Sequence, residues 1–107
     1  MTKTTDGPQI QLLVQKIREK FEPQRIILFG SYANGIPTKG SDIDLLIVMN
    51  TNLKPYKQAS LIRLFLDETF GVTYPIDIIV RTPESIERRI KEGDFFIKSV
   101  LEEGASL

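Results

Sequence analysis

Two short groups of residues in this chain have the types and the spacing to do chemistry together. Gly30 and Ser31 follow an apolar segment, and after ten intervening residues Asp42 and Asp44 open a second apolar segment. A Gly-Ser turn can present backbone N–H groups and a hydroxyl to phosphate oxygens. Carboxylates two residues apart on a strand point to the same side. Together these groups indicate a triphosphate cradle that faces a divalent-metal site, which is equipment for phosphoryl or nucleotidyl transfer.

The segment that begins with Asp42 and Asp44 predicts a central strand, because it is apolar on both faces beyond its first residues. A strand holds such a carboxylate pair about 5–7 Å apart. Burying unpaired carboxylates costs several kcal/mol, and a divalent cation removes both the burial cost and the mutual repulsion. The alternative is that Asp42 caps the loop and Asp44 pairs with a lysine or arginine.

Asp77 is the only charge in the apolar stretch 74–80. Aspartate is disfavoured in strands, so its place there needs a reason. One reason is an edge strand that turns Asp77 to water, with which Pro75 is compatible. The other places Asp77 beside Asp44 on a neighbouring strand, as a third carboxylate that could also accept the proton of an attacking hydroxyl.

Gly30 and Ser31 are the predicted phosphate side of the site. Glycine permits a tight turn and a close approach of the backbone. Ser31 and the N–H groups that follow it can bind phosphate oxygens if Ser31 opens a short helix. The alternative is an ordinary turn or helix cap.

Composition narrows the chemistry. The 107 residues predict one domain over 1–107, with 14 basic and 14 acidic residues and a formal net charge of zero. We therefore expect no direct nucleic-acid binding through a basic surface. The chain has no cysteine and no histidine, so a metal must be held by oxygen ligands, as magnesium, manganese and calcium are. A signal peptide and a membrane span are not evident, which predicts a cytoplasmic protein without membrane contact.

Periodicity predicts the order of the elements. Apolar residues recur at helical spacing from Ile10 to Phe21, and Pro23 follows. The apolar runs predict strands at 25–29, 42–49 and 74–80. The remaining patterns predict helices at about 56–70, 82–91 and 94–103, with Thr82 and Asp94 as the expected caps of the last two. The result is an α/β or α+β fold, in which a small three-stranded sheet has helices covering one face.

The combined motif resembles the nucleotidyltransferase fold of the DNA polymerase beta superfamily. FGSYANG followed by SDIDLLIV is most similar to its minimal nucleotidyltransferase (MNT) branch, and the resemblance covers residues 8–103. It implies a three- to four-stranded mixed sheet that binds ATP or another nucleoside triphosphate with two Mg²⁺ ions, or with Mn²⁺. NMP would pass to a hydroxyl, with Gly30 and Ser31 at the triphosphate, Asp42 and Asp44 at the metals, and Asp77 at a metal and the acceptor.

The resemblance also implies a partner. Several MNT proteins are antitoxins of HEPN-domain toxins, which they adenylylate on a tyrosine or neutralise by binding. We therefore expect a HEPN-type protein partner. The last helix is the candidate contact surface, because Phe95, Phe96, Val100 and Leu101 are more large apolar residues than one buried helix face needs. The alternative is that Phe96 packs under the preceding helix.

One position departs from the family pattern. Asn34 stands where many relatives carry arginine, and it cannot give phosphate a cationic fork. A catalytically weak MNT fold that acts by binding is therefore one alternative, and a nucleotidyltransferase for a small molecule or RNA is another.

Overall fold

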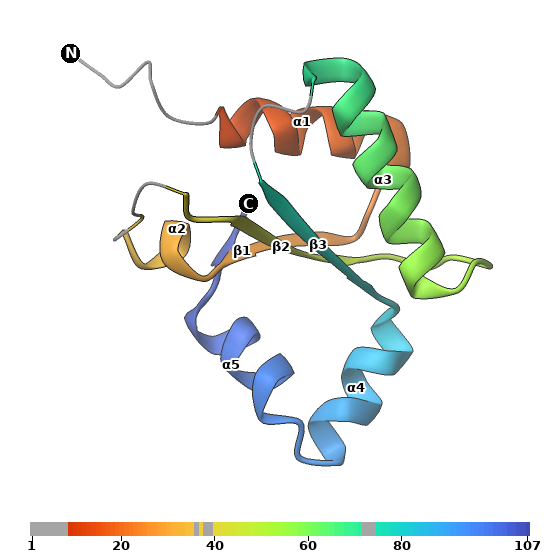
Figure 1. The fold of residues 1–107 in the computed structure, drawn as a ribbon. Helices are drawn as coiled ribbons and strands as arrows, with labels where there is room; N and C mark the ends of the chain where they lie inside the picture. Colours follow the sequence, from red (N-terminus) through yellow and green to blue (C-terminus); the bar gives the residue numbers. More distant parts are fainter. Residues whose placement is uncertain (1–8, 36, 38–39, 72–74) are drawn as a thin grey trace.

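The computed structural model describes residues 9–35, 37, 40–71 and 75–107, which build a four-stranded mixed sheet with helices packed on it (Figure 1). The strand order is β3-β2-β1-β4. Strand β1 is antiparallel to β2 and to β4, whereas β2 and β3 are parallel. The predicted mixed sheet and fold class are confirmed, with strands at β1 (Arg25–Phe29), β2 (Ile43–Val48), β3 (Ile76–Arg81) and β4 (Ala105–Ser106).

The helices agree closely with the apolar periodicity of the sequence. Those in the described part are α1 (Ile10–Phe21), α2 (Ser31–Asn34), α3 (Pro55–Phe70), α4 (Pro83–Lys91) and α5 (Phe95–Glu103). Helix α2 confirms the conditional prediction that Ser31 opens a short helix. Tyr74, the predicted first residue of the third strand, lies outside the described residues. None of the described helices has both the length and the apolar character that a membrane crossing needs.

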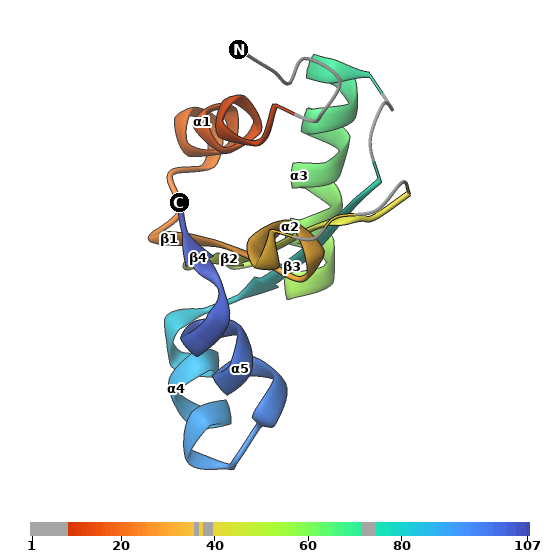
Figure 2. The same ribbon diagram turned by 90° about the vertical axis from the view of Figure 1, so that its left-hand side faces the viewer.

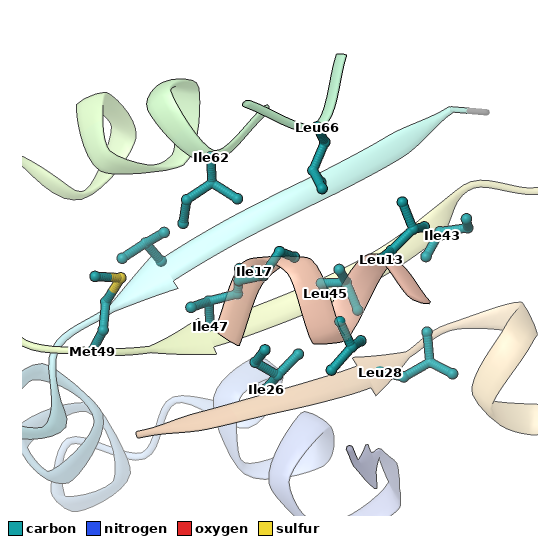
Figure 3. Close-up of a cluster of buried hydrophobic side chains, with 12 residues drawn as sticks. Leu13, Ile17, Ile26, Leu28, Ile43, Leu45, Ile47, Met49, Ile62 and Leu66 are labelled. Carbon is teal, nitrogen blue, oxygen red and sulfur yellow. The ribbon is translucent and has the colours of Figure 1, made fainter. Parts of the chain in front are cut away.

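The main core lies between the sheet and the helices α1 and α3 (Figure 3). Leu13 and Ile17 of α1 and Ile62 and Leu66 of α3 are almost completely buried against one face of the sheet. That face carries alternate residues of β1 and β2: Ile26, Leu28, Ile43, Leu45 and Ile47. The rings of Phe21 and Phe65 also meet edge to face at 5.6 Å, which joins the two helices.

The prediction that helices cover only one face is wrong. Helices α4 and α5 pack on the opposite face, as Figures 1 and 2 show. The reason is in β2, where Leu46 and Val48 point away from α1 and α3 and are nevertheless buried. Val100 of α5 and Ile86 of α4 supply their cover. Because a central strand with two apolar faces needs cover on both, the helices divide between them.

The predicted partner surface on α5 is reduced by this packing. Val100 is only 5% exposed, and Leu101 is partly buried in the same cluster. Phe96 is 48% exposed, and its ring meets that of Phe29 edge to face at 5.6 Å. Phe95 alone stands out, at 85% exposed. Since α5 covers the sheet, its inward residues belong to the core, and the expected surface shrinks to Phe95 and the outer side of Phe96.

Asp94 connects the end of α4 to the start of α5. Its Oδ1 accepts a hydrogen bond from the Ile97 N–H at 3.0 Å, and its Oδ2 accepts one from Arg89 Nη1 at 3.1 Å. The Ile97 N–H is the main cause that lowers the pKa of the Asp94 carboxyl from its usual 3.8. A carboxyl with a lowered pKa stabilises the fold above its usual pKa, and this contribution disappears as the pH falls through the folded-state pKa.

We therefore expect Asp94→Asn to retain a helix cap but to lose the stabilisation that depends on charge. Its melting temperature should lie below that of the wild type at neutral pH, and the two should converge as the pH falls below about 3.8. Thr82→Ala is the control, because Thr82 Oγ1 is a neutral cap that accepts from the Ser85 N–H at 3.1 Å. Its deficit should not vary with pH. A deficit of Asp94→Asn that stays constant with pH would contradict this account.

Candidate active site

The parallel pairing of β2 with β3 places Asp44 beside Asp77. The two residues are direct partners in the register, so their side chains leave the same face of the sheet, the one that α4 and α5 cover. Asp42 lies just before β2, is exposed, and is near enough for its charge to act on Asp44. Asp77 is also exposed and lies on an edge strand. Both interpretations of Asp77 from the sequence therefore describe it: it faces water, and it lies next to Asp44.

Gly30 brings the main chain against Asp44 from the other neighbouring strand. Phe29 pairs with Asp44, and Gly30 follows with φ 74° and ψ −155°, a conformation that is essentially restricted to glycine. A Cβ atom built on Gly30 would lie 2.2 Å from Asp44 Oδ2. Glycine is therefore required here for two reasons, the backbone conformation and the space that the Asp44 carboxylate occupies.

Helix α2 begins directly after this contact. The carbonyl of Gly30 accepts hydrogen bonds from the N–H groups of Ala33 and Asn34, both at 3.1 Å. Ser31, the first residue of α2, is half-buried, whereas Asn34 at its end is exposed. Gly30 thus has the start of α2 next to it in the chain and the Asp44 carboxylate next to it in space. This juxtaposition is the one that the motif predicts for a phosphate group next to a metal.

The electrostatics of Asp44 differ from those of an ion pair. Burial is the main cause that raises the pKa of the Asp44 carboxyl above 3.8, and the charges of Asp77 and then Asp42 raise it further. No lysine or arginine in the described part of the chain forms an ion pair with Asp44. The alternative that Asp44 serves a structural ion pair therefore finds no support among these residues. A carboxylate surrounded by negative charge would be stabilised by a cation.

The donor set fits a hard divalent cation. The side chains of Asp42, Asp44 and Asp77 all offer oxygen, and the chain contains no histidine or cysteine that would select a softer metal. Their side chains do not form a closed ligand group, because residues 9–35, 37, 40–71 and 75–107 contain no cluster of three acidic side chains arranged to hold an ion. The fit of a cation to this site therefore rests on two observations. The strand register pairs Asp44 with Asp77, and the charges of Asp77 and Asp42 help to raise the pKa of Asp44.

Two hollows adjoin these residues. An open groove of about 590 Å³ runs along β3 and α3, and Asp77, Tyr56, Arg63 and Arg81 are among its lining residues. A smaller hollow of about 210 Å³ lies beside Gly30, between Asn34 of α2 and residues of α5 that include Phe96 and Glu103. The candidate site is thus open to solvent on the side of Asp77.

Arg63 and Arg81 lie at the edge of β3, a placement that the sequence did not predict. Arg63 Nη1 donates to the carbonyl of Ile76, and Arg63 Nε pairs with Asp67 Oδ1 at 3.2 Å. Arg81 Nη1 donates to the carbonyl of Val80 at 2.8 Å. Both arginines therefore bind backbone at the edge of β3, next to Asp77. An arginine that directly follows an apolar strand was the available signal for Arg81, whereas Arg63 gave none.

A family profile described as the nucleotidyltransferase domain matches residues 10–107. The chain belongs to this family. Nucleotidyltransferases of this kind generally use a nucleoside triphosphate and a divalent metal, which agrees with the donor set described above. A curated relative, a candidate protein adenylyltransferase of Methanocaldococcus jannaschii, is 37% identical over 100 residues that make up 92% of this chain and 93% of the relative.

Solved structures show that the nucleotidyltransferase fold extends over most of the chain. A chain of a mutant MntA–HpeT toxin–antitoxin complex superposes with a TM-score of 0.61 at 17% identity, and the match covers 94% of this chain and 72% of that one. A candidate nucleotidyltransferase from Sulfolobus solfataricus superposes with a TM-score of 0.54 at 22% identity, with 74% and 68% covered. At these identities the likeness concerns the fold. The resemblance inferred from the motif is confirmed at the level of family and fold.

We expect Gly30→Ala to unfold at a much lower urea concentration than Gly35→Ala. Both glycines have positive φ, but a Cβ on Gly35 meets nothing within 4 Å. Gly35→Ala should therefore lose only about 1 kcal/mol of unfolding free energy through backbone strain, whereas Gly30→Ala must also displace Asp44 and should lose about 3 kcal/mol or more. Equal losses in the two variants would show that the contact between Gly30 and Asp44 is not a tight one.

Removing the charge of Asp44 should not destabilise the protein without metal. Because Asp44 is disfavoured by burial and by its acidic neighbours, Asp44→Asn should keep or raise the melting temperature in EDTA. It should also lose any increase that magnesium causes in the wild type, since a ligand stabilises only through its preference for the folded state. Asp67→Asn is the matched control, because it breaks the pair with Arg63 and should lower the melting temperature. A large loss for Asp44→Asn in EDTA would indicate a structural ion pair.

Proposed function

We propose that this nucleotidyltransferase domain transfers AMP from ATP to a hydroxyl group on a protein partner. The observation that carries the proposal is the register of Asp44 with Asp77 at a point where Gly30 brings the start of α2 against Asp44. Asp44, Asp77 and the turn at Gly30 thus adjoin one another, which supports a metal and a triphosphate binding side by side here. The relative that is 37% identical is named as a candidate protein adenylyltransferase, which supports this choice of substrate class.

In this proposal Asp42, Asp44 and Asp77 hold magnesium, with two ions expected and manganese as a substitute. When bound, the metal neutralises charge on the phosphates and orients them for in-line attack. Gly30 and Ser31 bind the triphosphate through the Ser31 hydroxyl and the N–H groups of Ser31 and Tyr32, since the N–H groups of Ala33 and Asn34 already donate to the Gly30 carbonyl. The main chain at Gly30 can approach the phosphates closely because no side chain intervenes.

Asp77 is the residue that we assign to proton transfer. The acceptor hydroxyl loses its proton to the Asp77 carboxylate, its oxygen forms a bond to the α-phosphorus, and the bond from that phosphorus to the pyrophosphate oxygen breaks. Asp77 is exposed on the edge strand, so a hydroxyl on another protein can reach it. The chain has no histidine to take this role, and Asp44 is half-buried toward β1.

We further propose that the partner is a HEPN-type toxin and that the domain acts as its antitoxin. The support is the motif FGSYANG…SDIDLLIV, whose resemblance to MNT antitoxins is stated above, and a fold shared with a chain of the MntA–HpeT toxin–antitoxin complex. A tyrosine hydroxyl is the expected acceptor. Phe95, the most exposed large apolar residue on the α4/α5 side, is a candidate contact.

A second function, neutralisation by binding alone, is favoured by Asn34. This residue ends α2 beside the hollow next to Gly30, and its side chain brings no positive charge to a triphosphate. If triphosphate binding is weak for this reason, contact with the partner would be sufficient for neutralisation without any transfer.

The test combines the purified protein, magnesium and ATP with a HEPN-type partner, and measures the intact mass of the partner. We expect one or more AMP additions with the wild type and none with Asp77→Ala, which should still bind ATP in calorimetric titration. Asp42→Asn combined with Asp44→Asn should abolish the magnesium-dependent binding of ATP itself. Asp67→Ala is the control, because it removes a carboxylate that lines the same groove as Asp77 and has no role in transfer.

The two functions give different outcomes in this experiment. Unchanged partner mass, together with full neutralisation of the partner by Asp77→Ala, would favour binding alone. Equal binding of ATP by the wild type and by the double variant of Asp42 and Asp44 would overturn the assignment of the site.

A further inference from the structure

The two edges of the sheet are unequal. On one side β4 consists of Ala105 and Ser106 only, whereas β3 on the other side runs for six residues, Ile76–Arg81. Within those six residues β3 contains no proline and no lysine, and its two charged residues, which can also protect an edge, are of opposite sign, Asp77 and Arg81. A long edge strand without such residues can pair with another strand of suitable sequence.

The hydrogen bonds to β2 show which backbone groups of β3 point outward. The Ile43 N–H donates to the carbonyl of Pro75 at 2.9 Å, and the Met49 N–H donates to that of Arg81 at 3.1 Å. Odd-numbered residues of β3 therefore direct their backbone groups toward β2. In a parallel ladder the alternate residues point the other way, so the N–H and C=O groups of Ile78 and Val80 face the open edge.

The sequence of β3 is complementary to itself in antiparallel orientation. If two copies pair about Ile79, each Asp77 lies opposite Arg81 of the other copy, and each Ile78 lies opposite Val80. The outward backbone groups of Ile78 and Val80 then meet as hydrogen-bonded pairs, while Asp77 and Arg81 form a non-hydrogen-bonded pair, in which side chains approach more closely. Opposite charges at such positions stabilise the pairing of strands.

We propose that two copies of this protein associate through their β3 edges, antiparallel about Ile79, with Asp77 of each copy paired with Arg81 of the other. The register is fixed by charge, because a shift of two residues would remove both ion pairs. It is also fixed by the backbone, because a shift by an odd number of residues would no longer bring the outward groups of Ile78 and Val80 together.

The hydrogen bonds that the outer edge of β3 makes within one copy are compatible with the dimer. The Val80 carbonyl now accepts from the Arg81 side chain of its own strand, and Arg81 Nε is buried with no hydrogen-bond partner among the residues that the structure describes. In the dimer, the Ile78 N–H of the second copy replaces Arg81 at the Val80 carbonyl. The guanidinium, which lies within electrostatic range of Arg89 and Asp94, can then turn to the second copy's Asp77 carboxylate, a charged acceptor that is stronger than the carbonyl. Arg63 can keep the Ile76 carbonyl, which lies outside the central pairs.

The side of β3 that α3 covers also leaves room for a second copy. The groove along β3 is open, and Tyr56 and Leu64 of α3 are 64% and 53% exposed along it. In a continuous sheet the α3 helices of the two copies lie on the same face, one on each side of the seam. Tyr56 and Leu64 would then border the new interface and lose apolar surface to water.

The pairing has a consequence for the site that rests on the proposed function. Asp77 is the residue assigned to proton transfer, and in the dimer it is held by Arg81 of the second copy. The associated form would then be a resting state, from which an acceptor protein must displace the second copy. The existence of the dimer does not depend on that assignment.

Charge reversal tests the pairing directly. We expect sedimentation over a range of protein concentrations to show a monomer–dimer equilibrium for the wild type. Asp77→Arg and Arg81→Asp should each weaken it on the order of tenfold or more, because each places two like-charged pairs at the seam. The double variant with both changes should restore dimerisation. Arg88→Asp, an exposed arginine on α4, is the control that should leave it unchanged.

A second measurement does not depend on changing Asp77 or Arg81. The chain has no cysteine, so Ile79→Cys introduces a single thiol that lies opposite its own copy, about 4.5 Å away between Cα atoms. Mild oxidation should give a covalent dimer. Ile76→Cys is the control, because its copy would lie about 20 Å along the strand and beyond the reach of a disulfide.

The outcomes decide the proposal. A protein that stays monomeric at its highest soluble concentration would overturn it. A dimer that the double charge reversal does not rescue, or one in which Ile76→Cys cross-links as well as Ile79→Cys, would also overturn it. Neither measurement uses a nucleotide, so a failure of the proposed transfer reaction would leave these results unaffected.

Discussion

The parallel pairing of β2 with β3 is the constraint on which the rest of the molecule depends. Parallel neighbours cannot be joined by a hairpin, so the chain must cross over one face of the sheet between them. Helix α3 is that crossover, and its residues Ile62 and Leu66 are fixed in the core. Arg63 adds a direct bond to the first residue of β3. The position of Asp77 beside Asp44 is thus determined by the packing of a helix that carries no residue assigned to transfer.

The same arrangement places a cost on the fold. Asp44 is held between Gly30 and Asp77 where burial and like charge both disfavour its ionised form. The apolar residues of β2 that follow it, buried on both faces, offset that cost within the same strand. Within β2, Asp44 therefore belongs to the candidate site, whereas the other five residues, Ile43 and Leu45 to Val48, are buried and stabilise the fold. This division is common where a binding site is less stable than the scaffold that supports it.

Local signals in the sequence were sufficient to predict the helices and strands and to select the candidate site residues. Apolar runs located the strands, the caps at Thr82 and Asp94 located two helix starts, and the Gly-Ser turn led into α2 as expected. What sequence reasoning missed depends on contacts between distant segments. That α4 and α5 cover the second face, that Val100 is core, and that Ala105 reaches β1 are all decided by packing partners far away in the chain. The placement of Arg63 at Ile76 has the same character, because an exposed arginine and an arginine at a strand edge look alike in a sequence.

The short strand β4 sets the direction in which the chain leaves the sheet. Ala105 and Ser106 pair with β1, and the Leu107 N–H donates to the Ile26 carbonyl at 2.8 Å, so the described chain finishes on the side of the sheet away from β3 (Figure 2). Any peptide, dye or surface tether that is attached after residue 107 therefore begins across the full width of the sheet from Asp77. Such an attachment point allows the protein to be immobilised or labelled while the acidic residues stay accessible to nucleotide and to another protein.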